Sequence, residues 1–184
     1  MNEELPSSQM ALKLLHESGC SKKVIAHCKA VSALAVKFAK TCKNRGLPVD
    51  VNLVEVGALL HDIGRSKTHG ITHAVVGVEI AESLNLPPSV ISIIGCHIGG
   101  GITADEAKKV GLPAKDYLPT TLEEKIVSYA DKLIEGQKVV PIEKTLKHFC
   151  KKLGKDHPAI DRIISLHEEL SQLIGDSDAD FYTA

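Results

Sequence analysis

Apolar residues recur every three or four positions along most of this chain, a periodicity typical of amphipathic α-helices. Between residues 21 and 46 they stand at Val24, Cys28, Val31, Leu34, Ala35 and Phe38. The alternation of a β-strand is nearly absent. Hydrophobic residues make up 43% of the 184 positions, but aromatic residues only 3%, and there is no tryptophan. The core must therefore be built from aliphatic side chains, and we predict an all-α, single-domain helical bundle over residues 1–184.

Capping residues, prolines and glycines divide the chain into a series of expected helices. These run from Ser8 to Ser18, from Ser21 to near Arg45, from Asp50 or Asn52 through His61-Asp62, from near Thr72 to before Pro87, from Pro87-Pro88 through His97, from Thr103 to Gly111, from Thr121 through Asp131, from Pro141 to Leu153 and from Pro158 to Ile174. We expect a loop over residues 65–70.

The composition narrows the class of protein. A net charge of −1 provides no basic field that would recruit a nucleic acid. The five cysteines are an odd number with no C-x-x-C pair, which predicts reduced thiols and a cytoplasmic location. The acidic N-terminus resembles no signal peptide, and no apolar run approaches the ~20 residues that span a bilayer. The oligomeric state is left open.

His61 and Asp62 stand together in the apolar run from residue 56 to residue 65. His27 and Asp131 likewise lie among apolar neighbours. Burying such groups without partners costs several kcal/mol, and one divalent cation would satisfy all four. Imidazole with carboxylate suits Fe, Mn, Co, Ni or Zn, with Mg as a further option. No cysteine is among the four, which argues against a closed structural zinc site.

Two more histidines extend this ligand pattern. His73 opens an expected helix and His97 ends another, beside the glycines at positions 99 to 101. If both reach the same cavity, a second metal ion can bind, with Asp62 as the bridge. The structural alternatives are that His73 bonds a backbone carbonyl and that His97 interacts with the helix dipole.

The ordered residues His27, His61-Asp62 and Asp131 resemble the H…HD…D signature of the HD-domain phosphohydrolase superfamily. The run from His61 to Arg65 resembles the HD-I-G-K form of the motif, and His73 and Cys96-His97 resemble the later motifs of its two-metal members, including small hydrolases of diadenosine tetraphosphate and HD-GYP phosphodiesterases. Two positions differ from the motifs of the superfamily: Arg65 replaces the usual lysine, and Cys96 replaces a histidine. The G-Y-P segment is missing, which argues against a cyclic di-guanylate substrate.

The resemblance implies an all-α fold, a metal-bound hydroxide as nucleophile and a phosphate ester or anhydride as substrate. It covers roughly residues 21–135, the expected catalytic core. Residues 136–175 would then be accessory helices and residues 176–184 a frayed acidic tail.

Basic residues near the doublet suggest how a phosphate would be bound. We expect Asp62 and Arg65 to be catalytic, and the substrate to be contacted by Arg65, Lys67, His69 and Lys132. The structural alternatives are solvated side chains for Arg65, Lys67 and His69, and a lysine that extends from its helix into solvent for Lys132.

The sequence thus predicts a metal-dependent phosphomonoesterase or phosphodiesterase acting on a nucleotide or another small phosphate ester. Two alternatives remain open. A two-iron centre with the same ligands could activate oxygen, as in some relatives of the superfamily. A site that has lost productive geometry could instead sense a nucleotide or a metal without catalysis.

Overall fold

A computed structural model describes residues 4–175, and within this range the chain forms nine α-helices, one short 3-10 helix and a two-stranded hairpin. The elements are α1 (Ser8–Glu17), α2 (Lys22–Asn44), α3 (Val51–Leu60), the 3-10 helix η1 (Ile63–Ser66), α4 (His73–Ser83), α5 (Pro88–Cys96), α6 (Ala104–Lys109), α7 (Leu122–Lys132), β1 (Ile134–Glu135), β2 (Lys138–Val139), α8 (Ile142–Leu153) and α9 (Pro158–Ile174). The all-α prediction is confirmed. The expected acidic tail over residues 176–184 lies outside the described residues.

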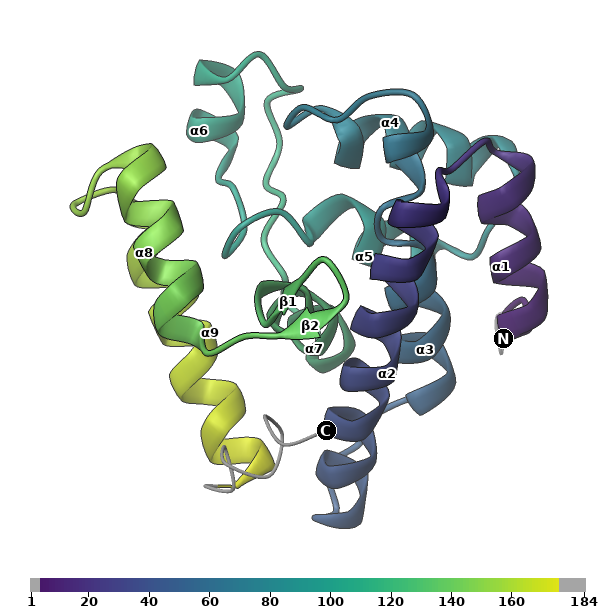
Figure 1. The fold of residues 1–184 in the computed structure, drawn as a ribbon, viewed down its shortest axis with the longest axis horizontal. Helices are drawn as coiled ribbons and strands as arrows, with labels where there is room; N and C mark the ends of the chain where they lie inside the picture. The colour runs from purple at the N-terminus through teal and green to yellow at the C-terminus, as the bar shows by residue number, and fades with distance from the viewer. Residues whose placement is uncertain (1–3, 176–184) are drawn as a thin grey trace.

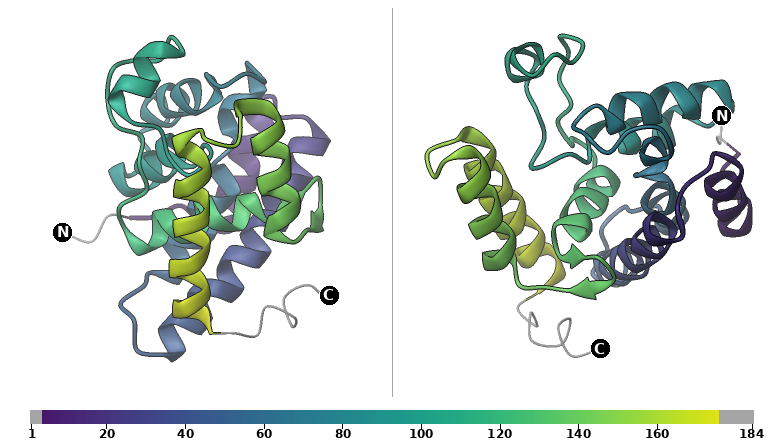
Figure 2. Two further views of the ribbon diagram at one scale, coloured as in Figure 1. Left: turned by 90° about the vertical axis from the view of Figure 1, so that its left-hand side faces the viewer. Right: turned by 45° about the horizontal axis from the view of Figure 1, so that its top comes forward.

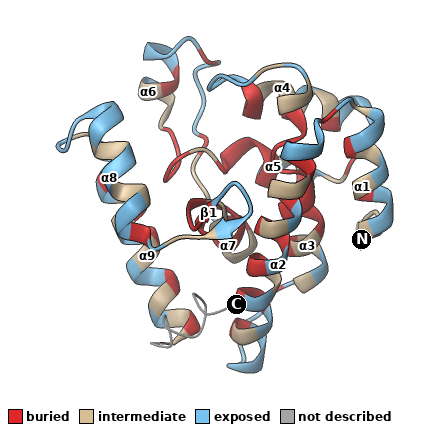
Figure 3. Ribbon diagram, viewed as in Figure 1, coloured by how far each residue is buried: buried red, intermediate tan, exposed pale blue. Residues whose placement is uncertain are grey.

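Helix α2 is the long central element and packs against α3 and α7 (Figure 1). Helices α4 and α5 pack against each other on one side of this group, while α8 and α9 form a pair on another side (Figure 2). The buried positions concentrate where α2, α3, α5 and α7 face one another (Figure 3). The largest core cluster includes the stacked rings of Phe38 and Tyr129, whose centroids lie 5.6 Å apart.

Side-chain caps fix where several helices begin. Ser21 accepts a hydrogen bond from the Val24 amide at the start of α2, and Asp50 caps α3. Thr103 and Thr121 each form the complete capping box that the sequence predicts. The caps at Ser21 and Thr121 fix the first turns of α2 and α7, the helices that carry His27 and Asp131.

The structure corrects three local predictions. Helix α3 ends at Leu60, so His61 and Asp62 follow the helix instead of lying within it. The expected loop after them begins with η1, which covers residues 63–66. A hairpin, β1 paired antiparallel with β2, follows α7 where the sequence shows no strand alternation. Each strand is two residues long, too short for alternation to be recognised.

Gly64 in η1 lies against the first turns of α4. A Cβ atom added there would lie 1.9 Å from the carbonyl oxygen of His73 and 2.6 Å from the amide nitrogen of Gly77. Both neighbours are backbone atoms of α4, so neither can move without separating η1 from that helix. Residue 64 must therefore be a glycine for Asp62 and His73 to approach each other.

We expect Gly64→Ala to lower the free energy of unfolding by about 3 kcal/mol, the upper end for overpacked cores. Urea denaturation would measure the change. Gly70→Ala is the matched control, because its added Cβ would have no heavy atom closer than 3.9 Å. That control is expected to stay within about 1 kcal/mol of the wild type. Equal losses in the two variants would contradict the close-approach argument.

Candidate metal centre

Four histidines converge from four different parts of the fold. His27 lies on α2, His61 directly follows α3, His73 is the first residue of α4, and His97 directly follows α5. In every case the Nδ1 atom lies within hydrogen-bond distance of a backbone carbonyl. The distances are 3.0 Å from His27 to Gly136, 2.7 Å from His61 to Ala58, 2.7 Å from His73 to Gly70 and 2.8 Å from His97 to Ile94.

These carbonyl contacts determine the state of the rings. A carbonyl oxygen can only accept a hydrogen bond, so each Nδ1 carries the proton. In the neutral ring Nε2 then presents a lone pair, the form in which histidine binds a metal ion. The Nε2 atoms of His73 and His97 lie only 2.9 Å apart. Two lone pairs at that distance repel unless a proton or a cation lies between them.

Asp62 lies between two groups of imidazoles and presents a different oxygen to each. Its Oδ1 atom is 3.1 Å from His73 Nε2 and 3.4 Å from His97 Nε2. Its Oδ2 atom is 3.7 Å from His61 Nε2 and 3.9 Å from His27 Nε2. Asp62 could therefore offer one oxygen to a cation on each side.

Asp131 completes the cluster from α7. Its Oδ1 atom is 3.0 Å from His27 Nε2 and 3.5 Å from His61 Nε2. The ligand atoms form two sets that share His61. One set is His27, His61 and Asp131, and the other is His61, Asp62 and His97. Within each set, all ligand atoms lie within 4.8 Å of one another. We call the six residues His27, His61, Asp62, His73, His97 and Asp131 the His-Asp cluster.

The cluster has unsatisfied polar atoms that fit a metal ion. Among the described residues, His61 Nε2 and Asp62 Oδ1 are buried without a hydrogen-bond partner. His61 is fully buried and Asp62 nearly so. Orphaned buried acceptors are costly, and both of these point toward other acceptors. A divalent cation coordinated by them would remove that cost, so the residues present can hold a metal ion.

The electrostatics favour ionised carboxylates and a neutral His97, but not a neutral His61. Burial opposes charge on both carboxylates, but the imidazoles around Asp62 hold its pKa well below the usual range, and Lys132 does the same for Asp131. Burial, reinforced by the neighbouring His61 and His73, lowers the pKa of His97 to about 4. His97 is thus neutral at pH 7. Burial also opposes charge on His61, but Asp62 and Asp131 outweigh this effect and raise the pKa of that ring.

Arg65 and Lys132 flank the cluster with positive charge. Arg65 Nε donates to Asp62 Oδ2 at 2.5 Å, and its Nη1 donates to the carbonyl of His69 at 3.3 Å. Lys132 is buried, and its Nζ donates to Asp131 Oδ2 and, at 3.1 Å, to the carbonyl of His97. Both side chains therefore position the carboxylates, and both also line a cavity beside the cluster.

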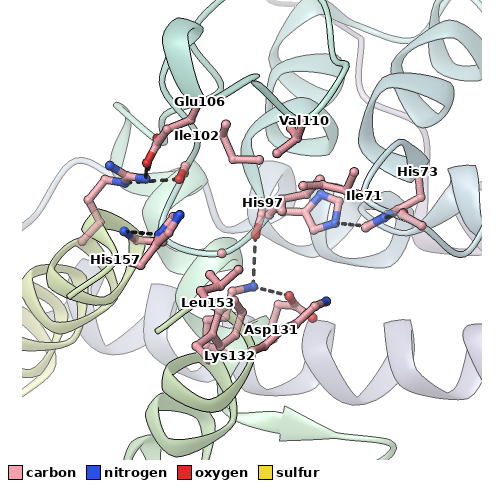
Figure 4. A pocket seen from close by; sticks show the side chains of 18 of the residues that line it. Ile71, His73, His97, Ile102, Glu106, Val110, Asp131, Lys132, Leu153 and His157 are labelled. Atoms are coloured by element: carbon pink, nitrogen blue, oxygen red, sulfur yellow. Dashed lines mark hydrogen bonds and ion pairs between the residues drawn. The ribbon is translucent and has the colours of Figure 1, made fainter. Parts of the chain in front are cut away.

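This cavity has a volume of about 360 Å³ and extends from the cluster to α8 and α9 (Figure 4). A second cavity of about 320 Å³ is lined by His27 and Asp62. His69 and Arg65 line both. Lys67 is exposed and lines neither, so the structure does not bring it to the cluster with the other expected contacts.

Several residues that line the first cavity carry no motif in the sequence. They are Phe149, Lys152, Leu153, His157 and Arg162, all on or next to α8 and α9. Two histidines outside the His-Asp cluster, His157 and His167, are partly buried. His157 accepts from the Ala159 amide as the cap of α9, and His167 lies 2.7 Å from the Tyr129 hydroxyl.

The glycines at positions 99 to 101 allow close packing against neighbouring segments. A Cβ on Gly100 would lie 2.8 Å from Arg162 Cβ, and one on Gly101 would lie 2.7 Å from Leu118 Cδ2. Arg162 also donates to the Gly101 carbonyl and pairs with Glu106. This segment therefore joins α6 and α9 at one wall of the cavity.

Comparisons with known proteins find relatives with similar sequences. A relative that is 53% identical over 166 residues is an uncharacterized protein of Methanocaldococcus jannaschii, and the match covers 90% of this chain and 98% of that protein. A tRNA (cytidine(56)-2'-O)-methyltransferase of Thermoplasma volcanium is 44% identical over 171 residues. That match covers 93% of this chain but 48% of the methyltransferase, so the chain spans about half of that relative's length.

A solved structure shares the fold. The HD domain of the L. monocytogenes phosphodiesterase PgpH, in complex with cyclic-di-AMP, superposes with a TM-score of 0.53 at 19% identity, covering 89% of this chain and 96% of that one. Across the described residues no helix has both the length and the apolar character needed to cross a membrane. The HD domain model matches residues 24–136, which include all six residues of the cluster. The chain therefore belongs to the HD-domain family.

Proposed function

We propose that this chain is a metal-dependent phosphohydrolase that acts on a nucleotide or another small phosphate ester. The observation that carries the proposal is the convergence of four Nε2 atoms and two carboxylates, in which two buried acceptors have no hydrogen-bond partner among the described residues. Such a donor set suits Fe, Mn, Co, Ni or Zn, with His73 and His97 as the ligands that would hold a second ion. When bound, the metal lowers the pKa of a coordinated water and stabilises charge on a phosphoryl oxygen.

The chain's own residues would hold the reacting groups in place. The Nδ1 contacts to backbone carbonyls keep each imidazole in one tautomer and one orientation. Lys132 fixes the carboxylate of Asp131 and adds positive charge at the cavity wall. Among the described residues, no acceptor bonds to Nη2 of Arg65, so this donor remains for a phosphoryl oxygen whose charge grows during reaction.

The cavity supports a small substrate. Ligand sites of about 300–1,000 Å³ hold molecules of nucleotide size, and the cavity of about 360 Å³ is at the small end of this range. The structure of a similar fold contains a cyclic dinucleotide, which lends support to a nucleotide as the substrate class.

The test is release of phosphate or a nucleotide from a panel of phosphomonoesters and phosphodiesters, with oxygen consumption recorded in the same reactions. We expect metal-dependent hydrolysis with no uptake of oxygen. Oxygen uptake coupled to product formation would instead indicate a two-iron oxygenase. Nucleotide binding without turnover by the metal-loaded protein would indicate a sensing module.

A further inference from the structure

Exposed apolar side chains gather at one cavity. Large hydrophobic side chains that stand exposed in the described part of the chain are Met10, Ile71, Leu84, Val110 and Leu153. Three of them, Ile71 at 39%, Val110 at 47% and Leu153 at 39% exposure, line the cavity beside the His-Asp cluster (Figure 4). Scattered exposed apolar residues are ordinary, whereas three that converge at one cavity offer a surface suited to an apolar group.

The three side chains come from segments far apart in the sequence. Ile71 precedes α4, Val110 follows α6, and Leu153 is the last residue of α8. Phe149 lies one turn before Leu153, so the two share a face of α8, and Phe149 also lines the cavity. We call Ile71, Val110, Phe149 and Leu153 the apolar lip.

The same cavity is also lined by polar groups. It reaches His97 and Asp131 of the His-Asp cluster and Lys132 beside it. On the α8 side it is lined by Lys152, which has no ion-pair partner among the described residues. Arg162, by contrast, is bonded to Glu106 and to the Gly101 carbonyl, and serves the fold.

We propose that the apolar lip binds the base of a nucleotide whose phosphate lies at the His-Asp cluster, and that α8 supplies the contacts that select for the base. This inference rests on the proposed function, because the cluster places the phosphate. An aromatic ring and three aliphatic side chains suit the flat apolar face of a base. A sugar phosphate would leave the lip exposed to water. The two residues of the apolar lip on α8, Phe149 and Leu153, lie after residue 136, where the match to the HD domain model ends.

The first test compares esters with and without a base. Hydrolysis of AMP and of ribose 5-phosphate is measured in the wild type and in Phe149→Leu, which keeps an apolar side chain but removes the ring. We expect kcat/KM for AMP to fall about tenfold, in line with the loss of base stacking, while the value for ribose 5-phosphate changes by less than about twofold. Calorimetry with adenosine and with ribose gives a binding readout that needs no turnover. We expect adenosine alone to bind, more weakly in the variant.

A matched pair of lysines tests whether Lys152 contacts the phosphate of the substrate. Lys152 lines the cavity and the adjacent Lys151 does not, although both are exposed on α8. We expect Lys152→Ala to raise KM for AMP and ribose 5-phosphate alike by about three- to tenfold, as for a charge-assisted phosphate contact. Lys151→Ala should match the wild type.

The outcomes separate the two proposals. Equal kcat/KM for the two esters, with no adenosine binding, would overturn the apolar lip and leave the phosphohydrolase standing. Adenosine binding that depends on Phe149, without hydrolysis of any ester, would support the lip and overturn the enzyme. A preference for a 5′-phosphorylated dinucleotide over AMP would support the lip with an RNA end as the source of the nucleotide.

Discussion

Replacement of Asp62 by alanine is expected to reduce phosphoester hydrolysis by about three orders of magnitude or more, with loss of the bound metal. Each oxygen of this carboxylate faces a different pair of imidazoles, at 3.1 and 3.4 Å on one side and 3.7 and 3.9 Å on the other. Alanine removes both contacts and leaves Arg65 without its partner. Initial rates and metal content, measured on the same preparation, would test this expectation.

Two further variants make the result interpretable. Asp62→Asn keeps the shape of the side chain but removes its charge, and should lose activity to a similar degree while remaining folded by circular dichroism. Asp156→Ala changes an exposed aspartate between α8 and α9 and should behave as the wild type. Unchanged turnover in Asp62→Ala would reject the catalytic assignment of the cluster.

Removal of metal is expected to lower the melting temperature by about 8–16 °C. The ligands come from α2, α4 and α7 and from the segments after α3 and α5, so two bound ions would together cross-link five parts of the fold, and a single ion at least two of them. A ligand at about a thousand times its Kd stabilises the native state by about 4 kcal/mol. Each kcal/mol shifts the melting temperature of a chain of this size by about 2–4 °C. Thermal denaturation before and after dialysis against a chelator measures the shift.

Restoration of the metal provides the control for that experiment. Addition of Mn, Co, Ni or Zn to the stripped protein should raise the melting temperature again, and the same treatment should leave Asp62→Ala unaffected. Identical melting curves with and without chelator would show that no ion contributes to the stability of the wild type.

The sequence predicts the helices well because the signals that define them are local. The capping boxes at Thr103 and Thr121 and the proline at the start of α5 each act within one turn of a helix. The end of α3 is different. Helix α3 ends at Leu60, and the segment after it packs Gly64 against the backbone of α4, a contact that no pattern within one helix predicts.

The His-Asp cluster shows the same difference between what local sequence signals predict and what only packing determines. The residue types and their order predict a metal site, and the structure brings all six proposed ligands together. The roles of Arg65 and Lys132 are less visible. Each pairs with a carboxylate close to it in the sequence, Asp62 and Asp131 respectively, but only the packed structure places both side chains in the wall of one cavity. The cavity wall at Phe149 and Lys152 has no sequence signal, since α8 reads as an ordinary amphipathic helix.

The most direct test of the account is elemental analysis of the protein purified without a metal-affinity tag, in parallel with His61→Ala. His61 belongs to both ligand sets and has an unpartnered Nε2 atom, so its loss affects every arrangement of the ions. We expect the wild type to contain at least about one transition-metal ion per chain, rising toward about two if His73 and His97 hold a second ion, and the variant to contain far less. A folded wild-type protein with no stoichiometric metal, and with no metal taken up on addition, would contradict the account.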